Sequence, residues 1–243
     1  MLRLTTLTAI LALGACANSG DEGFIVLNNT AVTGSCSLTG STSQPFISHG
    51  QIYAKSTTGY LLTPLIQSRI STGNGSADID PTTRTIYLTG ANVSLEVKAV
   101  SIEHADGSFG TANVTLSGQQ AQFSTLFSAS LPPGGTVNVG FEAIPVQTLR
   151  TILTASGAAA TDKMNAEVLA TVTVLGMMGG DQLSAQPFQF PITVCNNCVV
   201  VNNGACPFTG TLRTGNACNI FQDGIVDCCT DATNNLICPA TTM

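Results

Sequence analysis

The chain has 243 residues and a formal net charge of −6; 9% of its residues are charged and 44% are hydrophobic. This composition argues against intrinsic disorder, which requires high charge and few apolar residues. Lysine and arginine form no cluster in the sequence, which argues against nucleic-acid binding. The acidic balance also argues against electrostatic adhesion to anionic lipid.

The N-terminal residues have the pattern of an export signal. Arg3 supplies a positive charge, and residues 4–15 are apolar apart from three threonines. A stretch of about a dozen residues is too short for a membrane-spanning helix, which needs about 20. A positive start, a short apolar run and small residues at its end are typical of a removable signal peptide.

The end of this signal, residues 13–16 (LGAC), resembles the lipobox of bacterial lipoproteins. The resemblance implies that residues 1–15 are removed and that Cys16 is the lipid attachment site. Residues 16–23 would then be a lipidated polar tether to the lipid bilayer. Stable anchoring needs more than one acyl chain, which a lipobox cysteine carries. By analogy with enteric bacteria, Ala17 after the cysteine favours the outer membrane. A plain signal peptide cleaved elsewhere, with loss of Cys16, is the alternative.

Residues 24–194 show the alternation of short β-strands separated by turn residues. The predicted strands cover residues 24–27, 50–56, 60–70, 84–89, 92–104, 111–116, 122–129, 136–144, 167–175 and 187–194. Pro64 predicts an edge or a bulge, residues 90–92 a turn, and a slip of the alternation near Ala99 a bulge. This pattern predicts an all-β fold, an immunoglobulin-like β-sandwich domain. Whether residues 24–194 form one sandwich or two stays open.

One segment of this domain has a helical period. Val146, Leu149, Ile152 and Leu153 recur at helical spacing between a proline and Gly157. Proline at the start and glycine at the end of such a pattern are typical of a short helix.

Residues 195–243 form a cysteine-rich C-terminal region, which we expect to be dominated by loops. Without Cys16, an even set of eight cysteines remains, which predicts a disulfide framework in an exported chain. These disulfide candidates are Cys36, Cys195, Cys198, Cys206, Cys218, Cys228, Cys229 and Cys238. If all are oxidised, one cysteine of the tail must pair with Cys36, and the adjacent Cys228 and Cys229 should have different partners. The sequence does not choose among the connectivities.

Metal and redox chemistry are the alternatives for this tail. The Cys195/Cys198 pair has the spacing of a zinc or redox motif, but the tail has no histidine and a strand-like run follows. Calcium could use Asp223, Asp227 and Asp231, although their spacing is not that of an EF-hand. Asp78 and Asp80 form another weak calcium candidate. We expect no cofactor and no metal.

Few residues are suited to catalysis. His49 and His104 are predicted at the surface, and no G-x-S-x-G motif is present. The glutamates on presumed strands, predicted to face solvent, are Glu96, Glu103, Glu142 and Glu167. We therefore expect a non-enzymatic envelope lipoprotein with a binding or structural role at the cell surface. The lack of tryptophan favours a protein partner over a sugar. The alternative is a hydrolase of a cell-wall or extracellular polymer, which a histidine–carboxylate pair in a cleft would favour.

Overall fold

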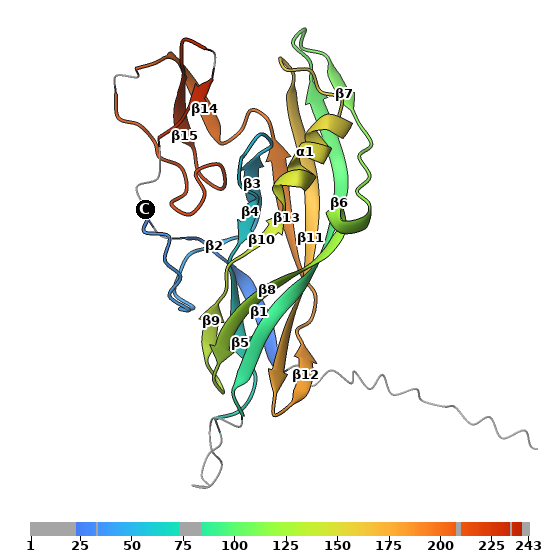
Figure 1. Ribbon diagram of the computed structural model, residues 1–243, viewed down its shortest axis with the longest axis vertical. Helices are drawn as coiled ribbons and strands as arrows, with labels where there is room; N and C mark the ends of the chain where they lie inside the picture. The colour runs from blue at the N-terminus through green and yellow to red at the C-terminus, as the bar shows by residue number, and fades with distance from the viewer. Residues whose placement is uncertain (1–22, 33, 73–83, 208–209, 234, 240–243) are drawn as a thin grey trace, which may run out of the picture.

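The structure is a computed structural model that describes residues 23–32, 34–72, 84–207, 210–233 and 235–239. It confirms an all-β chain with one short helix and a disulfide-rich tail (Figure 1). No helix in these described residues is long and apolar enough to cross a membrane.

The largest sheet has seven strands and two long central ones, β6 and β11. Its order is β3-β13-β11-β6-β7, with β12 added to β11 and β8 added to β6. The strands are β3 (Gly50–Tyr53), β6 (Ile86–Glu103), β7 (Phe109–Thr111), β8 (Gln122–Leu131), β11 (Lys163–Met178), β12 (Asp181–Ser184) and β13 (Phe188–Cys195). β3 runs parallel to β13, and all other neighbours are antiparallel.

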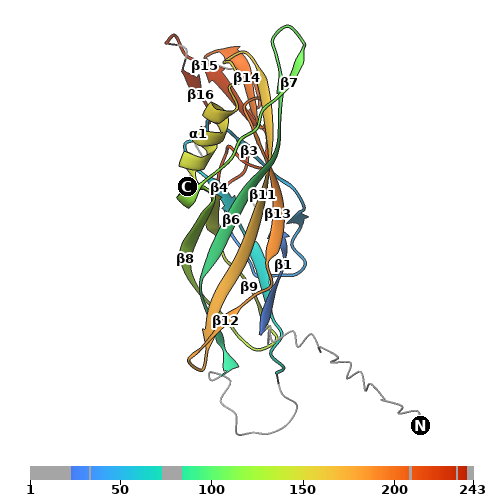
Figure 2. The ribbon, with the colours of Figure 1, turned by 90° about the vertical axis from the view of Figure 1, so that its right-hand side faces the viewer.

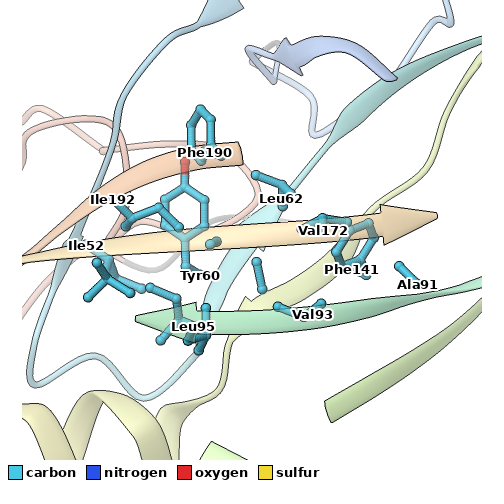
Figure 3. Close-up of a cluster of buried hydrophobic side chains, with 14 of the residues drawn as sticks. Ile52, Tyr60, Leu62, Ala91, Val93, Leu95, Phe141, Val172, Phe190 and Ile192 are labelled. Carbon is cyan, nitrogen blue, oxygen red and sulfur yellow. The ribbon is translucent and has the colours of Figure 1, made fainter. Parts of the chain in front are cut away.

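Shorter strands form smaller sheets that share the core of the large one. One has the order β2-β1-β5-β9, and β10 pairs separately with β4. Their bounds are β1 (Phe24–Thr30), β2 (Phe46–Ile47), β4 (Tyr60–Leu62), β5 (Pro64–Ser68), β9 (Thr136–Asn138) and β10 (Phe141–Ile144). One cluster of buried side chains draws residues from both sets of strands, as in a β-sandwich. Figure 3 shows Tyr60 and Phe141 of the smaller sheets with Val93, Val172 and Phe190 of the large sheet.

Residues 84–104 differ from the prediction of two strands and a turn. β6 is one strand that continues through residues 90–92. Gly90 permits this, because a Cβ there would collide with the carbonyl oxygen of Thr125 on β8. The predicted bulge is confirmed: Glu167 pairs with Ala99 but Val168 pairs with Val97, so Lys98 is the extra residue.

Residues 60–70 also differ from the prediction. They form two strands, because the chain passes from one sheet to another at Pro64. β5 lies between β1 and β9, so the expectation of an edge is wrong. The alternative of a bulge is confirmed, because the register between β1 and β5 shifts beside Pro64, between Val26 and Asn28. Proline has no N–H to continue the ladder of β4, which makes it a natural point for the change. Residues 136–144 divide in the same way into β9 and β10. Of the predicted strand 111–116, only Thr111 belongs to a strand, as the last residue of β7.

The predicted helix is confirmed as α1 (Val146–Ala155), directly after Pro145. Leu149 and Ile152 are fully buried and hold the helix against the sandwich core. Gly157 follows with a φ of +69°, a left-handed conformation that suits glycine and ends the helix.

The tail contains more regular structure than the predicted loops. β14 (Val200–Ala205), β15 (Val226–Thr230) and β16 (Leu236–Ile237) form a small sheet in the order β14-β15-β16. The remainder of the described tail consists of turns and loops. Figure 1 shows this small sheet beside one end of the sandwich.

Candidate functional site

All eight candidate cysteines form disulfides in the structure. The pairs are Cys36–Cys218, Cys195–Cys198, Cys206–Cys229 and Cys228–Cys238. The tail is therefore linked covalently to Cys36 of the sandwich, and the adjacent Cys228 and Cys229 have different partners. Cys195 and Cys198 are bonded to each other in this structure. Cys16 lies outside the described residues.

The tail covers one edge of the large sheet. Phe221 accepts a hydrogen bond from the backbone N–H of Tyr53 (2.9 Å), and the N–H of Asp223 donates to Gln51 (2.9 Å). Gln222 forms an antiparallel bridge with Ile52 between them. Residues 221–223 thus pair with the outer side of β3, so that side is not an open edge.

Buried amide side chains hold this part of the tail against β4. Gln222 is 1% exposed, and its amide accepts from the N–H of Leu61 (2.8 Å) and donates to the Leu61 carbonyl (2.9 Å). Asn219 donates to the carbonyl of Gly59 (2.8 Å). Polar groups are costly to bury unless they are hydrogen-bonded, and these three bonds all meet backbone groups of the sandwich. The sandwich and this segment consequently form one unit.

Asp223 is the charged group at the junction between the sandwich and residues 219–223 of the tail. Its carboxylate accepts hydrogen bonds from the Gln51 N–H (2.7 Å) and the Tyr60 hydroxyl (2.8 Å). Burial raises the pKa of Asp223, and these hydrogen bonds act against that rise. Burial, and then the neighbouring Asp223 charge, raise the pKa of Tyr60 well above its usual value. The backbone of Asp223 is left-handed, with a φ of +51°.

A small pocket of about 270 Å³ opens between the sandwich and the tail at this junction. It is lined by Ile47, His49, Gln51, Val199, Asp223, Gly224 and Ile225. The His49 side chain is 45% exposed, and its Nε2 lies 2.8 Å from the Thr193 hydroxyl and 3.3 Å from a carboxylate oxygen of Glu167. This is a histidine–carboxylate pair at the rim of a pocket, the feature that would favour a hydrolase.

The geometry around His49 differs from that of a nucleophile–histidine–acid relay. In such a relay the acid holds one ring nitrogen and the nucleophile contacts the other. Here Thr193 and Glu167 both contact Nε2, and the Thr193 hydroxyl donates to Glu167 (2.7 Å). The Thr193 hydroxyl therefore contacts His49 and Glu167 together, an arrangement that differs from such a relay.

The calcium candidates do not come together. Both carboxylate oxygens of Asp227 are held by Arg213 (2.6 and 2.9 Å), and Asn203 donates to one of them (3.0 Å). These bonds, chiefly those from Arg213, keep the pKa of Asp227 well below its usual value. Asp231 accepts from the N–H groups of Thr233 and Asn235 within its own loop, while Asp223 lies at the junction.

No group of three or more histidine, cysteine, aspartate or glutamate side chains in the described residues could hold a metal ion. The alternative calcium candidates, Asp78 and Asp80, lie outside those residues.

The other acids and His104 are dispersed over the sheets. Glu96 pairs with Lys98 on the same strand, and Glu103 pairs with Lys163 across the ladder. His104 pairs with Asp162 at 3.0 Å, so it has a specific partner as well as surface exposure. These pairs lie in different parts of the surface and do not add to the His49 pocket.

β8 lies at the opposite margin of the large sheet from β3. It pairs with β6 on one side, and among the described residues no strand pairs with its other side. Figure 2 shows β8 along the outer margin of the ribbon. The Leu126 side chain in the middle of β8 is 88% exposed, the highest value among the large hydrophobic side chains that the structure describes. Sequence alternation identified the strand but did not show that it would be uncovered.

Comparison with known proteins assigns no family. No family model and no curated protein matches the chain. A protein from Archaeoglobus fulgidus of known crystal structure has 12% identity and a TM-score of 0.31, over 65% of this chain and 90% of that one. The sporulation control protein Spo0M from Bacillus subtilis has 12% identity and a TM-score of 0.22, over 56% of this chain and 43% of its own.

Proposed function

We propose that this chain is an exported envelope lipoprotein, anchored in the outer membrane through acylated Cys16, that acts by binding a protein partner. Its four disulfides support export, because disulfides persist in oxidising compartments and are rare in the cytosol. The lipobox-like residues 13–16 supply the matching route and attachment point.

The uncovered edge of β8 is the observation that carries the binding role. An exposed strand edge presents unpaired N–H and C=O groups to which an extended protein segment can add. The tail covers the opposite edge at β3 but leaves this one open. An extended protein segment therefore fits this surface better than a sugar, for which the chain offers no tryptophan.

Replacement of Cys16 tests the anchor. We expect Cys16→Ala to move the protein from the membrane fraction to the soluble fraction of the envelope. Ser19→Ala is the matched control and should stay with the membrane. Mass spectrometry of the native N-terminus should show lipid on Cys16. Unchanged membrane retention of Cys16→Ala would refute the anchor.

One observation favours the alternative hydrolase, namely the His49–Glu167 pair beside the pocket. The test is degradation of cell-wall or extracellular polymers by the purified protein. Activity that is lost in both His49→Ala and Glu167→Gln, and kept in Lys98→Ala, would replace the binding proposal.

A further inference from the structure

The regular part of the β8 edge is short and well defined. Residues 122–126 pair one-to-one with residues 94–90 of β6. A register shift follows, because Leu126 pairs with Gly90 while Ala129 pairs with Leu88. A bulge disturbs the hydrogen-bonding edge, so a further strand would add along residues 122–126.

The charge distribution makes this edge suitable for a second copy of the same chain. The chain carries a net charge of −6, so identical copies repel each other over most orientations. Three strands in the described part of the chain have ten residues or more, namely β6, β8 and β11. β6 and β11 carry charged side chains, whereas β8 carries none. Two β8 strands can therefore approach without placing like charges opposite each other, which would destabilise the pair.

Side-chain alternation fixes the symmetry of such a pair. Gln122, Ser124 and Leu126 are exposed on one face of β8, whereas Phe123 and Thr125 are half-buried on the other. In an antiparallel pair, residues directly opposite each other have their side chains on the same face of the sheet. Two identical strands therefore keep their exposed faces on the same side only if one residue lies opposite its own counterpart, at the two-fold axis. If a residue lay opposite the counterpart of its neighbour, one of the two sheets would be turned over.

We propose that two copies of this chain associate through β8, antiparallel, about a two-fold axis at Ser124. Ser124 then faces its own counterpart, and Leu126 of each copy faces Gln122 of the other. The pairing joins the two large sheets into one continuous sheet and covers the exposed Leu126 and the edge of Phe123. This inference rests on the proposed function and names its protein partner as a second copy of the chain. Membrane anchoring would favour the association, because it concentrates the copies.

The association should be weak and reversible. Stable interfaces bury about 1,200–2,000 Å² in total, and five paired residues on each copy bury much less. We therefore expect self-association that grows with concentration rather than a permanent dimer.

Sedimentation velocity of the full chain tests the proposal. Cys16→Ala removes the acylation site, so this chain is studied without detergent over about a hundredfold range of concentration. We expect a monomer that shifts to a dimer as concentration rises. Ser124→Lys should weaken the dimer at least about tenfold, because two lysines meet at the axis. Thr89→Lys adds the same charge at an exposed position of β6 and should leave the dimer unchanged. Circular dichroism and the thiol count verify folding of both variants.

Hydrogen exchange then locates the contact. Amides of residues 122–126 should gain protection at high concentration, and this gain should disappear in Ser124→Lys. A monomer at every concentration, or a dimer insensitive to Ser124→Lys, would overturn the proposal.

Crosslinking in intact cells separates this inference from the proposed function. If a different protein is crosslinked to the wild type and to Thr89→Lys but not to Ser124→Lys, while the purified chain stays monomeric, the inference fails and the binding role survives.

Discussion

The sandwich and the cysteine-rich tail are held together by different forces. The sandwich encloses a large apolar cluster with fully buried side chains such as Phe24, Leu62 and Ile192. The tail buries few apolar side chains, among them Val226, and uses disulfides and the Arg213–Asp227 pair instead. A short segment cannot bury enough surface to fold through apolar contacts alone, so crosslinks limit its unfolded states. The difference predicts that each region fails under a different perturbation.

The largest effect should follow from a cavity in the sandwich. Phe190 is 2% exposed and lies 6.1 Å from Tyr60 between ring centres. We expect Phe190→Ala to lower the free energy of unfolding by about 3–5 kcal/mol in urea titrations under oxidising conditions. Phe109→Ala, at an 80% exposed side chain, should change it by less than about 0.5 kcal/mol. Equal losses in the two variants would show that the apolar core does not dominate the sandwich.

The next effect concerns the covalent link between the regions. Cys36 and Cys218 are 182 residues apart, so their disulfide closes a long loop. We expect Cys36→Ser with Cys218→Ser to cost about 2–5 kcal/mol and to expose the tail to limited proteolysis, with the sandwich intact.

Removal of the Cys228–Cys238 disulfide is the matched comparison. This disulfide closes a loop between residues only 10 positions apart. Cys228→Ser with Cys238→Ser should therefore lower the free energy of unfolding by less than the loss of Cys36–Cys218 does. A larger loss of stability in this double variant would contradict the expectation that Cys36–Cys218 is the more stabilising of the two disulfides.

A pH titration should separate the contributions of Asp223 and Asp227 to stability. The pKa of Asp227 is depressed, so its contribution to stability is complete above the ordinary value of 3.8 and is lost as pH falls below it. The pKa of Asp223 is raised, so its contribution has the opposite sign and declines as pH rises through and above 3.8.

Thermal unfolding between about pH 5 and pH 2 measures this difference. Asp227→Asn should reduce the loss of Tm at low pH, and Asp223→Asn should increase it. If the acid-induced loss of Tm changed in the same direction in both variants, the opposite pKa shifts assigned to Asp227 and Asp223 would be contradicted.

The smallest effect should come from an exposed ion pair of the sheet. Lys163 and Glu103 lie 2.7 Å apart, and their side chains are 51% and 40% exposed. Solvent screens such pairs, so we expect Lys163→Ala to cost less than about 1 kcal/mol. Its Tm in low and high salt provides the measurement. A larger loss of Tm that depends on salt would show that this surface ion pair contributes more to the stability of the sandwich than we expect.

Several features of the fold were predictable because they depend on local patterns. The strand predicted over residues 167–175 lies within β11, and the proline and glycine around α1 fixed that helix within a few residues. The continuation of β6 through Gly90 was not predictable, because a glycine in the sequence indicates a turn unless the close approach of β8 is known. The polar contacts of Gln222 and Asn219 join residues about 160 positions apart, and no sequence spacing announces them.

The sequence by itself determined the strand character of the domain, its one helix, and the need for an even set of crosslinked cysteines. The tertiary structure alone decided which cysteine pairs with Cys36, and why residues 221–223 cover β3 while β8 stays open. The physical reason is that alternation records only whether a side chain faces the core. The partner of a strand edge or of a thiol depends on distant segments that folding brings together.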